Sequence, residues 1–268
     1  MKLQFYKNID VVQINIKAGV SEYFFPQNVD WADKKIDKMI VYGSNPETGE
    51  VSPIDGVTPI FDREQLDSVY LDLYAEDNTQ IAYSMSAIDV LHTNNHPLEI
   101  NSKISLQTSK LVFSEEPEDA GCILVYVFWN TKVVETEEVP NRSVTVDFTI
   151  KSGEEIKLSD VIDTYIHSQS KKVKGIYLWG GYGYWSGLFI TLRDYNYRTI
   201  VKLLPGGFCR PPMGVDPVMI GGTQSQKVQS VQVAPFYLDN ADVDFDNSVI
   251  YNSSDDYATS QVTITFLY

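Results

Sequence analysis

The sequence predicts an all-β protein built from two tandem β-sandwich domains with short helical connectors. One pattern of alternating hydrophobic segments occurs twice along the 268 residues. The 17 tyrosines and 12 phenylalanines supply aromatic side chains, which favour strands as β-branched residues do. Segments with helical periodicity are few. Many short strands separated by turn residues are typical of a sandwich or a barrel.

The repeat is clearest in the last part of each half. Eight positions recur 139 residues later: Ile104, Leu106, Ser109, Leu111, Ile123, Val125, Val127 and Trp129 correspond to Val243, Phe245, Ser248, Ile250, Val262, Ile264, Phe266 and Tyr268. Three earlier blocks recur in the same order at offsets of 134, 137 and 119: Val12, Ile14 and Ile16 with Val146, Phe148 and Ile150; residues 39–43 with 176–180; Leu71, Leu73 and Ile81 with Ile190, Leu192 and Ile200. The offsets differ because loops vary in length more freely than strands. We therefore expect an internal duplication, with domains at residues 1–133 and 134–268.

The expected elements follow from this alternation, and turn residues such as Asp55 and Gly56 separate them. The expected strands are residues 12–16, 39–42, 69–73, 104–106, 123–129, 144–150, 176–179, 188–192, 229–233 and 262–268. Two connectors have helical spacing, residues 159–168 with Ser159 as the N-cap and residues 84–91. Pro140 ends the short charged junction between the halves and restricts the backbone entering the next strand.

Two long loops stand out. Residues 43–62 contain three prolines, and residues 204–222 combine four prolines with five glycines and several apolar side chains. Ordered loops of this length are usually functional or lie in an interface, whereas flexible disorder is the alternative. The apolar side chains of the second loop favour burial against another surface.

The chain is acidic, with a net charge of −15. Residues 1–134 carry 10 basic and 20 acidic side chains, and residues 135–268 carry 11 and 16. No basic patch emerges, so direct nucleic-acid binding through the phosphate backbone is not expected. A soluble acidic surface explains the charge, and divalent-cation binding or electrostatic spacing in an assembly is the alternative.

Cysteine use and hydropathy set further limits. Cys122 and Cys209 lie in different halves, so we expect free thiols rather than a disulfide framework or a zinc motif. No apolar run approaches the roughly 18 residues of a membrane-spanning helix. The first residues lack the apolar centre of a signal peptide, which predicts synthesis in the cytoplasm.

The sequence singles out no catalytic, cofactor-binding or metal-ligating residue, so we expect neither enzymatic activity nor a cofactor. His92 and His96 have the spacing of one helix face, but two asparagines and a proline make a helix there unfavourable. Asp242, Asp244 and Asp246 alternate along a predicted strand and are expected to face outward. Carboxylates on a flat face repel each other, whereas a calcium site needs oxygens that converge.

An aromatic and glycine-rich segment begins at Trp179. The following residues, 188–192, form a predicted strand rather than a helix, so the segment is not a dinucleotide-binding loop. We interpret it as a hairpin whose rings pack in an interface or in the core, and carbohydrate contact is the alternative. The candidate interface residues are Trp179, Tyr182, Tyr184, Trp185, Phe208, Met213 and Met219.

Two tandem sandwiches that end on equivalent strands, at residues 123–129 and 262–268, resemble the double jelly-roll major capsid proteins of icosahedral membrane-containing viruses. The resemblance is to the corticovirus-like and flavobacterial lipid-containing phages. It covers nearly the whole chain and rests on architecture, because there is no short diagnostic motif.

The resemblance implies two jelly-roll domains and a homotrimer of pseudo-hexagonal outline that tiles the shell of a virion. The implied partners are lattice neighbours of the same chain, other virion proteins such as a penton or spike, and an internal lipid membrane. It also implies that the loops at residues 43–62 and 204–222 lie in towers or between subunits.

Two other functions fit the same sequence. A decoration protein of a tailed-phage capsid would need no membrane contact, and this chain has only Lys2 and Lys7 in place of a basic amphipathic N-terminus. A carbohydrate-binding β-sandwich protein would use exposed aromatic rings, for which Tyr182, Tyr184 and Trp185 are the best candidates.

Overall fold

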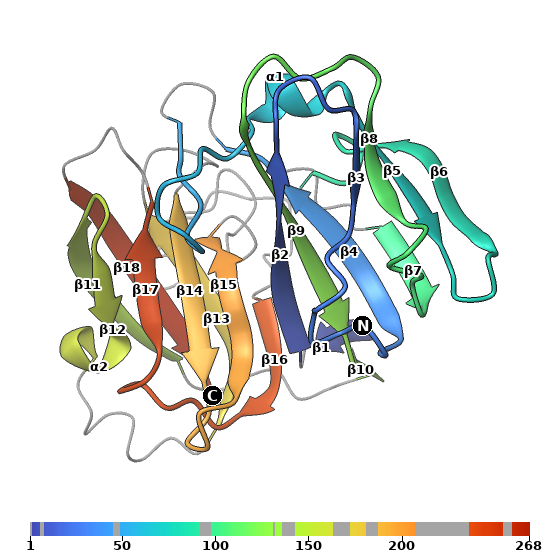
Figure 1. The fold of residues 1–268 in the computed structure, drawn as a ribbon. Helices are drawn as coiled ribbons and strands as arrows, with labels where there is room; N and C mark the ends of the chain where they lie inside the picture. The colour runs from blue at the N-terminus through green and yellow to red at the C-terminus, as the bar shows by residue number, and fades with distance from the viewer. Residues whose placement is uncertain are drawn as a thin grey trace, which may run out of the picture.

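The computed structural model describes residues 2–5, 8–44, 49–91, 98–130, 132–135, 143–162, 172–180, 187–206, 236–253 and 259–268. Strands dominate these residues, and their two helices are single turns, so the predicted all-β class with short helical connectors is confirmed (Figure 1). Neither helix in these residues is long and apolar enough to cross a membrane.

The first half contains two four-stranded sheets. Its strands are β2 (Asn8–Ile16), β3 (Glu22–Phe24), β4 (Ile36–Tyr42), β5 (Val69–Tyr74), β6 (Gln80–Ser86), β7 (Leu98–Ser102), β8 (Lys110–Phe113) and β9 (Gly121–Trp129). Their order is β2-β9-β4-β7 in one sheet and β3-β8-β5-β6 in the other. Helix α1 (Arg63–Leu66) precedes β5 and begins with a capping box, in which Asp62 and Gln65 bond to each other's backbone N–H.

The second half repeats this arrangement. Its elements are β11 (Ser143–Lys151), β12 (Glu155–Lys157), α2 (Leu158–Val161), β13 (Val173–Gly180), β14 (Leu188–Arg193), β15 (Thr199–Pro205), β16 (Phe236–Ala241), β17 (Val249–Asn252) and β18 (Thr259–Leu267). The strand order is β11-β18-β13-β16 and β12-β17-β14-β15. In both halves the first strand pairs with the eighth, and the second with the seventh. Eight strands wound this way in two sheets form a jelly roll.

A small antiparallel sheet lies outside the two sandwiches. It pairs β1 (Lys2–Phe5) with β10 (Lys132–Glu135). The boundary expected between residues 133 and 134 falls inside β10, and the extents 1–133 and 134–268 remain predictions.

Strand register confirms the residue-level repeat. Three pairs of neighbours in the first half have counterparts in the second: Ile14 with Ile123 and Phe148 with Val262; Val41 with Val125 and Leu178 with Ile264; Leu71 with Leu111 and Ile190 with Ile250. Each counterpart is reached by the offsets read from the sequence, 134, 137 or 119 on one strand and 139 on the other. The two halves are therefore equivalent in pairing as well as in strand order.

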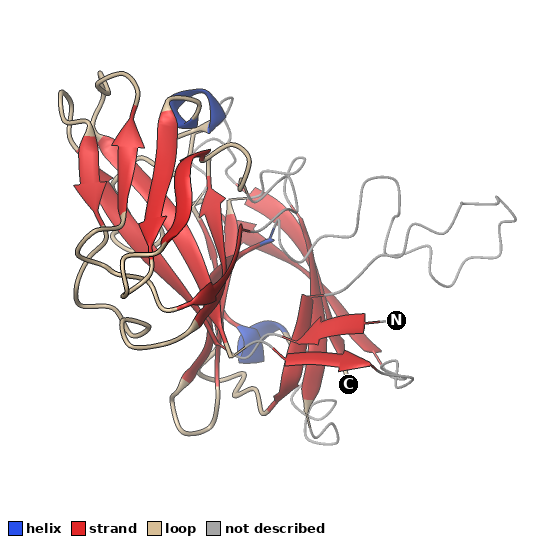
Figure 2. Cartoon of the chain, turned by 90° about the vertical axis from the view of Figure 1, so that its right-hand side faces the viewer, coloured by secondary structure: helices blue, strands red, loops and turns tan. Residues whose placement is uncertain are grey.

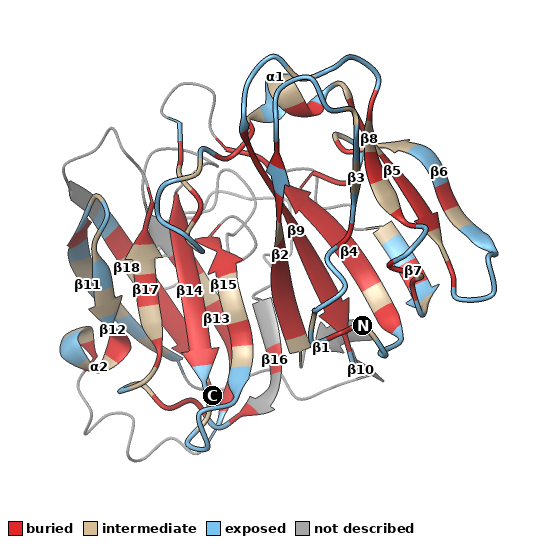
Figure 3. Cartoon of the chain, in the orientation of Figure 1, coloured by how far each residue is buried: buried red, intermediate tan, exposed pale blue. Residues whose placement is uncertain are grey.

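Two hydrophobic cores share the strand β9. Its odd-numbered side chains from Ile123 to Trp129 lie in a core made only of first-half residues. Its even-numbered side chains from Cys122 to Phe128 lie in a second core, together with residues of the second half. β9 is buried at every position (Figure 3), which explains its continuous apolar sequence.

The sheets of the two halves also join edge to edge. β15 and β2 meet through a parallel bridge between Val201 and Ile9, so that β12-β17-β14-β15-β2-β9-β4-β7 is one eight-stranded sheet. Figure 2 shows this strand-rich body from the side. The two sandwiches are therefore joined by a shared core and a shared sheet.

Three local predictions were wrong, and two predicted segments lie wholly or partly outside the described residues. Residues 84–91 form no helix, because Ser84 belongs to β6 and residues 87–90 form a turn; pairing of β6 with β5 outweighs the helical spacing of the apolar residues. Residues 104–106 form no strand beyond a single bridge from Ile104 to Ala75. Ser159 is not an N-cap, since α2 begins at Leu158 and the Ser159 N–H bonds to the carbonyl of Phe245. Residues 163–168 and 229–233 lie outside the described residues.

Candidate interaction surfaces

An apolar seam joins the two halves. We define the seam as Ile9, Val11, Tyr42, Leu124, Tyr126 and Phe128 from the first half, with Phe189, Val201, Leu203 and Leu204 from the second. The rings of Tyr42 and Phe189 lie 5.3 Å apart between centroids. Tyr126 donates its hydroxyl to the carbonyl oxygen of Leu203 at 2.6 Å. Burial, and to a lesser degree the charge of Glu50, raises the pKa of Tyr126 well above its usual value, so this hydroxyl stays a donor.

A charged pair also crosses the seam. Lys202 of β15 lies 3.0 Å from the carboxylate of Asp10 in β2, whose side chain is only 8% exposed. The same carboxylate oxygen accepts the backbone N–H of Val11 at 2.8 Å. Because Lys202 remains 45% exposed, water screens the pair, and its main effect is to fix the relative position of the two strands.

The loop after β4 packs on the seam rather than projecting from it. Glu50 is buried and accepts the hydroxyl of Tyr42 at 2.5 Å, and Ile60 forms a bridge with Cys122 of β9. Burial raises the pKa of the Cys122 thiol to about 12. The prediction that residues 43–62 lie in a tower or between subunits is therefore wrong for this part of the loop, because its apolar and acidic side chains complete an internal core.

The tip of this loop is exposed but well held. Asp55 accepts hydrogen bonds from the backbone of Val57 and Thr58, from the Thr58 hydroxyl at 2.6 Å and from the Gln13 amide at 2.7 Å. Partial burial raises the pKa of Asp55, but these bonds outweigh it and hold the pKa far below its usual value. The tip presents Ile54 and Val57, the latter 74% exposed.

The acidic run after β16 differs from its prediction. Asp242 and Asp246 are exposed, but Asp244 is buried. Asp244 accepts the backbone N–H of Asp246 at 3.1 Å and the side-chain amide of Asn247 at 2.8 Å. The expectation that all three aspartates share one outward face is wrong, because the chain turns at residues 245–247 instead of continuing as a strand. Within the described residues, no three His, Cys, Asp or Glu side chains are placed to hold a metal ion.

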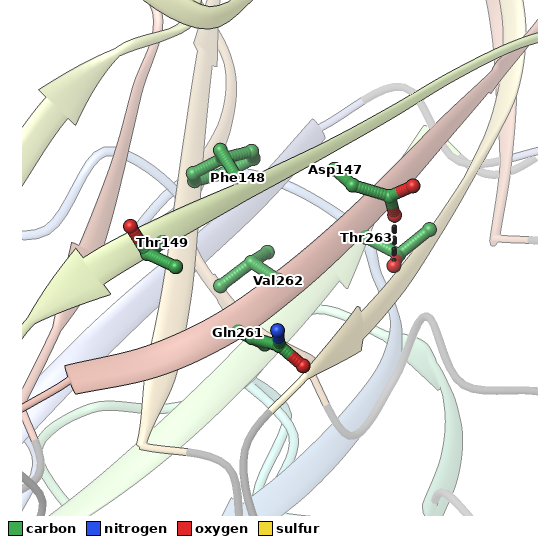
Figure 4. A pocket seen from close by; sticks show the side chains of 6 residues that line it. All are labelled: Asp147, Phe148, Thr149, Gln261, Val262 and Thr263. Atoms are coloured by element: carbon green, nitrogen blue, oxygen red, sulfur yellow. Dashed lines mark hydrogen bonds between the residues drawn. The ribbon is translucent and has the colours of Figure 1, made fainter.

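The outer face of β11 and β18 is polar. We call the residues Thr145, Asp147, Thr149, Gln261, Thr263 and Thr265 the threonine face. The hydroxyls of Thr145 and Thr265 lie 2.9 Å apart, and Thr263 donates a hydrogen bond to Asp147. A hollow of about 390 Å³ opens at Asp147, Phe148, Thr149, Gln261, Val262 and Thr263 (Figure 4).

The outer face of the sheet β3-β8-β5-β6 carries an exposed ring. We call Glu22, Phe24, Tyr70, Lys110 and Val112 the Phe24 face. Their neighbours Tyr23, Leu71 and Leu111 point into the first core. Phe24 is 53% exposed, and the Lys110 ammonium lies 6.0 Å from its ring centroid and 2.8 Å from Glu22.

Two exposed tyrosines mark the turn between β14 and β15. Tyr195 is 67% and Tyr197 70% exposed. Sequence reasoning missed them, although two tyrosines inside the polar run DYNYR between strands are a readable signal. The carboxylates of Asp244, Asp242 and Asp246 act on Tyr195, whose pKa is raised first by burial and then by these charges.

Most of the predicted interface residues lie outside the described residues. Trp179 lies in β13, where its backbone pairs with Thr263 of β18. Tyr182, Tyr184, Trp185, Phe208, Met213 and Met219 lie outside the described residues, as do Cys209, the three histidines and most of the loop at residues 204–222. Their assignment to an interface remains a prediction.

No family model matches the chain, and no curated protein matches it. A solved structure titled "Life in the extremes: atomic structure of Sulfolobus Turreted Icosahedral Virus" contains a chain with 10% sequence identity. The match covers 98% of this chain and 90% of that one, with a TM-score of 0.24. A TM-score this low carries no weight for the function of this chain.

Proposed function

We propose that the chain is a virion structural protein without enzymatic activity, a major capsid subunit that forms pseudo-hexagonal homotrimers and tiles an icosahedral shell. The observation that carries this proposal is the repetition of one eight-stranded sandwich topology in a single chain. The apolar seam holds the two sandwiches together, so that each subunit offers two similar lobes. Three such subunits supply six lobes around one axis, which is the outline of a hexagonal tile.

The charge of the chain fits regulated assembly. A net charge of −15 makes free subunits repel each other and stay soluble. Salt shortens the range of this repulsion, with a Debye length of about 10 Å at 0.1 M. We therefore expect association to strengthen between low and moderate ionic strength, which sedimentation velocity at several salt concentrations measures. Association that weakens with salt would contradict this role of the charge.

The proposed partners follow from the same role. They are other copies of the chain, vertex proteins such as a penton or spike, and an internal lipid membrane, with the virion as the location. Direct nucleic-acid contact is not part of the proposal, because the acidic excess occurs in both halves and would repel phosphates.

Electron microscopy of the concentrated protein tests the proposal. We expect six-lobed particles of uniform size that pack into sheets or closed shells. Only compact two-lobed particles, at every salt concentration and protein concentration tried, would contradict a capsid role.

A carbohydrate-binding function is the second candidate, and Tyr195 and Tyr197 favour it. Two exposed rings on one turn near exposed Asp242 and Asp246 can offer both a stacking surface and hydroxyl acceptors. Glycan-array binding that is lost in Tyr197→Ala would support this function, and absence of binding by the unmodified chain would exclude it for the glycans tested.

A further inference from the structure

The strand β11 has an open edge. It ends the sheet β11-β18-β13-β16 and pairs with β18 alone among the described strands. It lies at the margin of the second half that is farthest from the first half (Figure 1). Its nine residues pair with β18 without a register shift, so the strand is also regular along its other side. Such an edge presents a row of N–H and C=O groups that another strand can bond.

The other strands at the ends of the two sandwich sheets are protected against such pairing. β3 and β12 have only three residues each. β6, β7 and β16 pair with their neighbours through register shifts, and Ser84 of β6 and Asn101 of β7 have φ angles of 46° and 53°. Short strands and bulges are common means of blunting an edge. Within the described residues, β11 is therefore the long sandwich edge without such protection.

The equivalent strand of the first half, β2, has its edge closed. Ile9 forms a bridge with Val201 of β15, and the Asp10 carboxylate accepts the backbone N–H of Val11 at 2.8 Å. At the offset of 134, Val144 stands in place of Asp10, and a valine side chain offers no acceptor. Within the described part of the chain, this edge is thus closed in the first half and open in the second.

The odd-numbered residues of β11 direct their backbone groups to the open edge. The Lys151 N–H donates to the Glu154 carboxylate at 2.7 Å rather than to β18. Residues of an antiparallel strand direct their N–H and C=O to alternate sides, so the backbone groups of Thr145, Asp147 and Thr149 also point away from β18. These residues can bond a further strand.

The side chains of β11 suit a strand that continues the sheet. Val144, Val146 and Phe148 are half-buried and pack against the second core, whereas Thr145 and Thr149 are exposed. An added strand with the same alternation would cover the apolar side chains and keep polar residues on the outer face. β11 itself has this alternation.

We propose that the β11 strands of two copies pair antiparallel across a two-fold axis, with Phe148 opposite Phe148 of the second copy. In this register Asp147 lies opposite Thr149, and Lys151 is the diagonal neighbour of Asp147. Aromatic pairs and opposite charges on neighbouring strands stabilise a sheet. The neighbouring register places Asp147 opposite Asp147 and is disfavoured, because like charges then face each other.

A hollow lies at the centre of this contact. It measures about 390 Å³, and Asp147, Phe148 and Thr149 of β11 line it together with residues of β18 (Figure 4). Phe148 is half-buried beside this hollow, so side chains of the second copy can fill the space next to the axis.

The inference rests on the proposed capsid function and adds to it the contact between tiles. A two-fold contact is isologous, since the same surface of both copies takes part. A trimer with threefold symmetry contains no two-fold axis, so this contact joins subunits of different tiles. It would make one continuous sheet from the four-stranded sheets of two subunits.

Cross-linking tests the pairing directly. Asp147→Cys, Thr149→Cys and Tyr83→Cys, each with Cys209→Ser, are mixed in equal amounts at low salt, assembled at moderate salt and treated with a short bis-maleimide. Tyr83 is an exposed residue of the edge strand β6. Mass spectrometry should find links between positions 147 and 149 about tenfold more abundant than links between 149 and 83, because pairing raises the effective concentration of the first pair. Equal abundance, or an excess of links to position 83, would overturn the proposal.

A proline variant separates this inference from the capsid function. Thr149→Pro removes one N–H at the open edge, and proline is tolerated where the N–H of an edge strand faces away from its sheet. We expect Thr149→Pro to form the three-subunit species but no sheets or shells. The matched control Thr149→Val keeps the N–H and should assemble like the unmodified chain, and thermal melting shows whether both variants fold.

The outcomes of this comparison are distinct. If Thr149→Pro folds and assembles as well as Thr149→Val, the pairing of β11 is wrong and the capsid function stands. If the unmodified chain stays monomeric throughout, both are wrong. If Thr149→Pro does not fold, the cross-linking result decides alone.

Discussion

Ser109 and Ser248 are buried serines at equivalent positions of the two halves. The hydroxyl of Ser109 accepts the backbone N–H of Tyr74 at 3.0 Å, and that of Ser248 accepts the N–H of Arg193 at 3.0 Å. The two serines are 139 residues apart, and Tyr74 and Arg193 are 119 residues apart. The same hydrogen bond therefore joins equivalent residues in both halves, although the two strands differ in their offset. The repeat therefore extends to single hydrogen bonds that tie a loop to a central strand.

Removing either hydroxyl should cost a similar amount of stability. Ser109→Ala and Ser248→Ala each leave a partly buried N–H without its acceptor, which costs about 1 kcal/mol. Urea unfolding measures the change, and Ser114→Ala, at an exposed hydroxyl, should stay within about 0.5 kcal/mol of the unmodified chain. Loss confined to one of the two buried serines would show that the halves are not equivalent at this contact.

Tyr197 has an unfavourable backbone conformation for its type. Its φ is 60°, and the equivalent residue of the first half, Asn78, has a φ of 62°. Asparagine tolerates this left-handed region better than tyrosine, which carries a cost of about 1–2 kcal/mol there. Tyr197→Asn should therefore stabilise the fold by about 0.5–1 kcal/mol, measured by urea unfolding. Destabilisation would show that the exposed ring has contacts that outweigh the backbone cost.

Cys122 should be chemically silent in the folded protein. Its pKa of about 12 and its burial keep the thiolate fraction negligible near pH 8. In Cys209→Ser, a thiol reagent should react only after denaturation; rapid labelling of the native protein would contradict this.

The Cys122 thiol should also make stability depend on pH. Above about pH 9 the unfolded chain releases this proton while the native chain retains it until about pH 12, so stability should fall as pH rises through that window.

At the scale of elements, alternation located strands reliably but could not show which surfaces they share. The equivalent strands β9 and β18 were both predicted, yet β9 is buried on both faces while β18 alternates apolar residues with threonines. The sequence already shows this difference, because Leu124 and Tyr126 stand where β18 has Thr263 and Thr265. Its meaning requires knowing that the second half packs there, which depends on contacts between residues far apart in sequence.

Short elements were predicted less well, for identifiable reasons. Helical spacing at residues 84–91 competes with a strand partner, and pairing with β5 prevails. The acidic run was read as a strand with outward aspartates, but Asp244 accepts hydrogen bonds inside a turn. In both cases the deciding interaction is with a neighbour that alternation does not reveal.

The contact across the seam can be weakened at one atom. Tyr126→Phe keeps the ring but removes the donor to the Leu203 carbonyl, which is partly buried, and the lost hydrogen bond costs about 1 kcal/mol. Urea unfolding should show this loss within a single transition, because the halves share a core. Two separate transitions would show that the halves unfold independently.

At the scale of the whole molecule, the duplication and the class of fold could be predicted from the sequence, whereas the interaction surfaces could not. The composition of the aromatic segment from Trp179 predicts an interface, but most of that segment lies outside the described residues. The apolar residues of the seam have an ordinary composition in the sequence, and only the contacts between the two halves show that they form an internal interface.

The solution mass of the purified chain, measured by light scattering over a range of concentrations, tests the central claim most directly. The account predicts a species of three times the 30.3 kDa chain mass, or larger particles built from that species, at moderate salt. A single species of 30.3 kDa at every concentration and salt would contradict it, and would leave a monomeric binding protein as the better account.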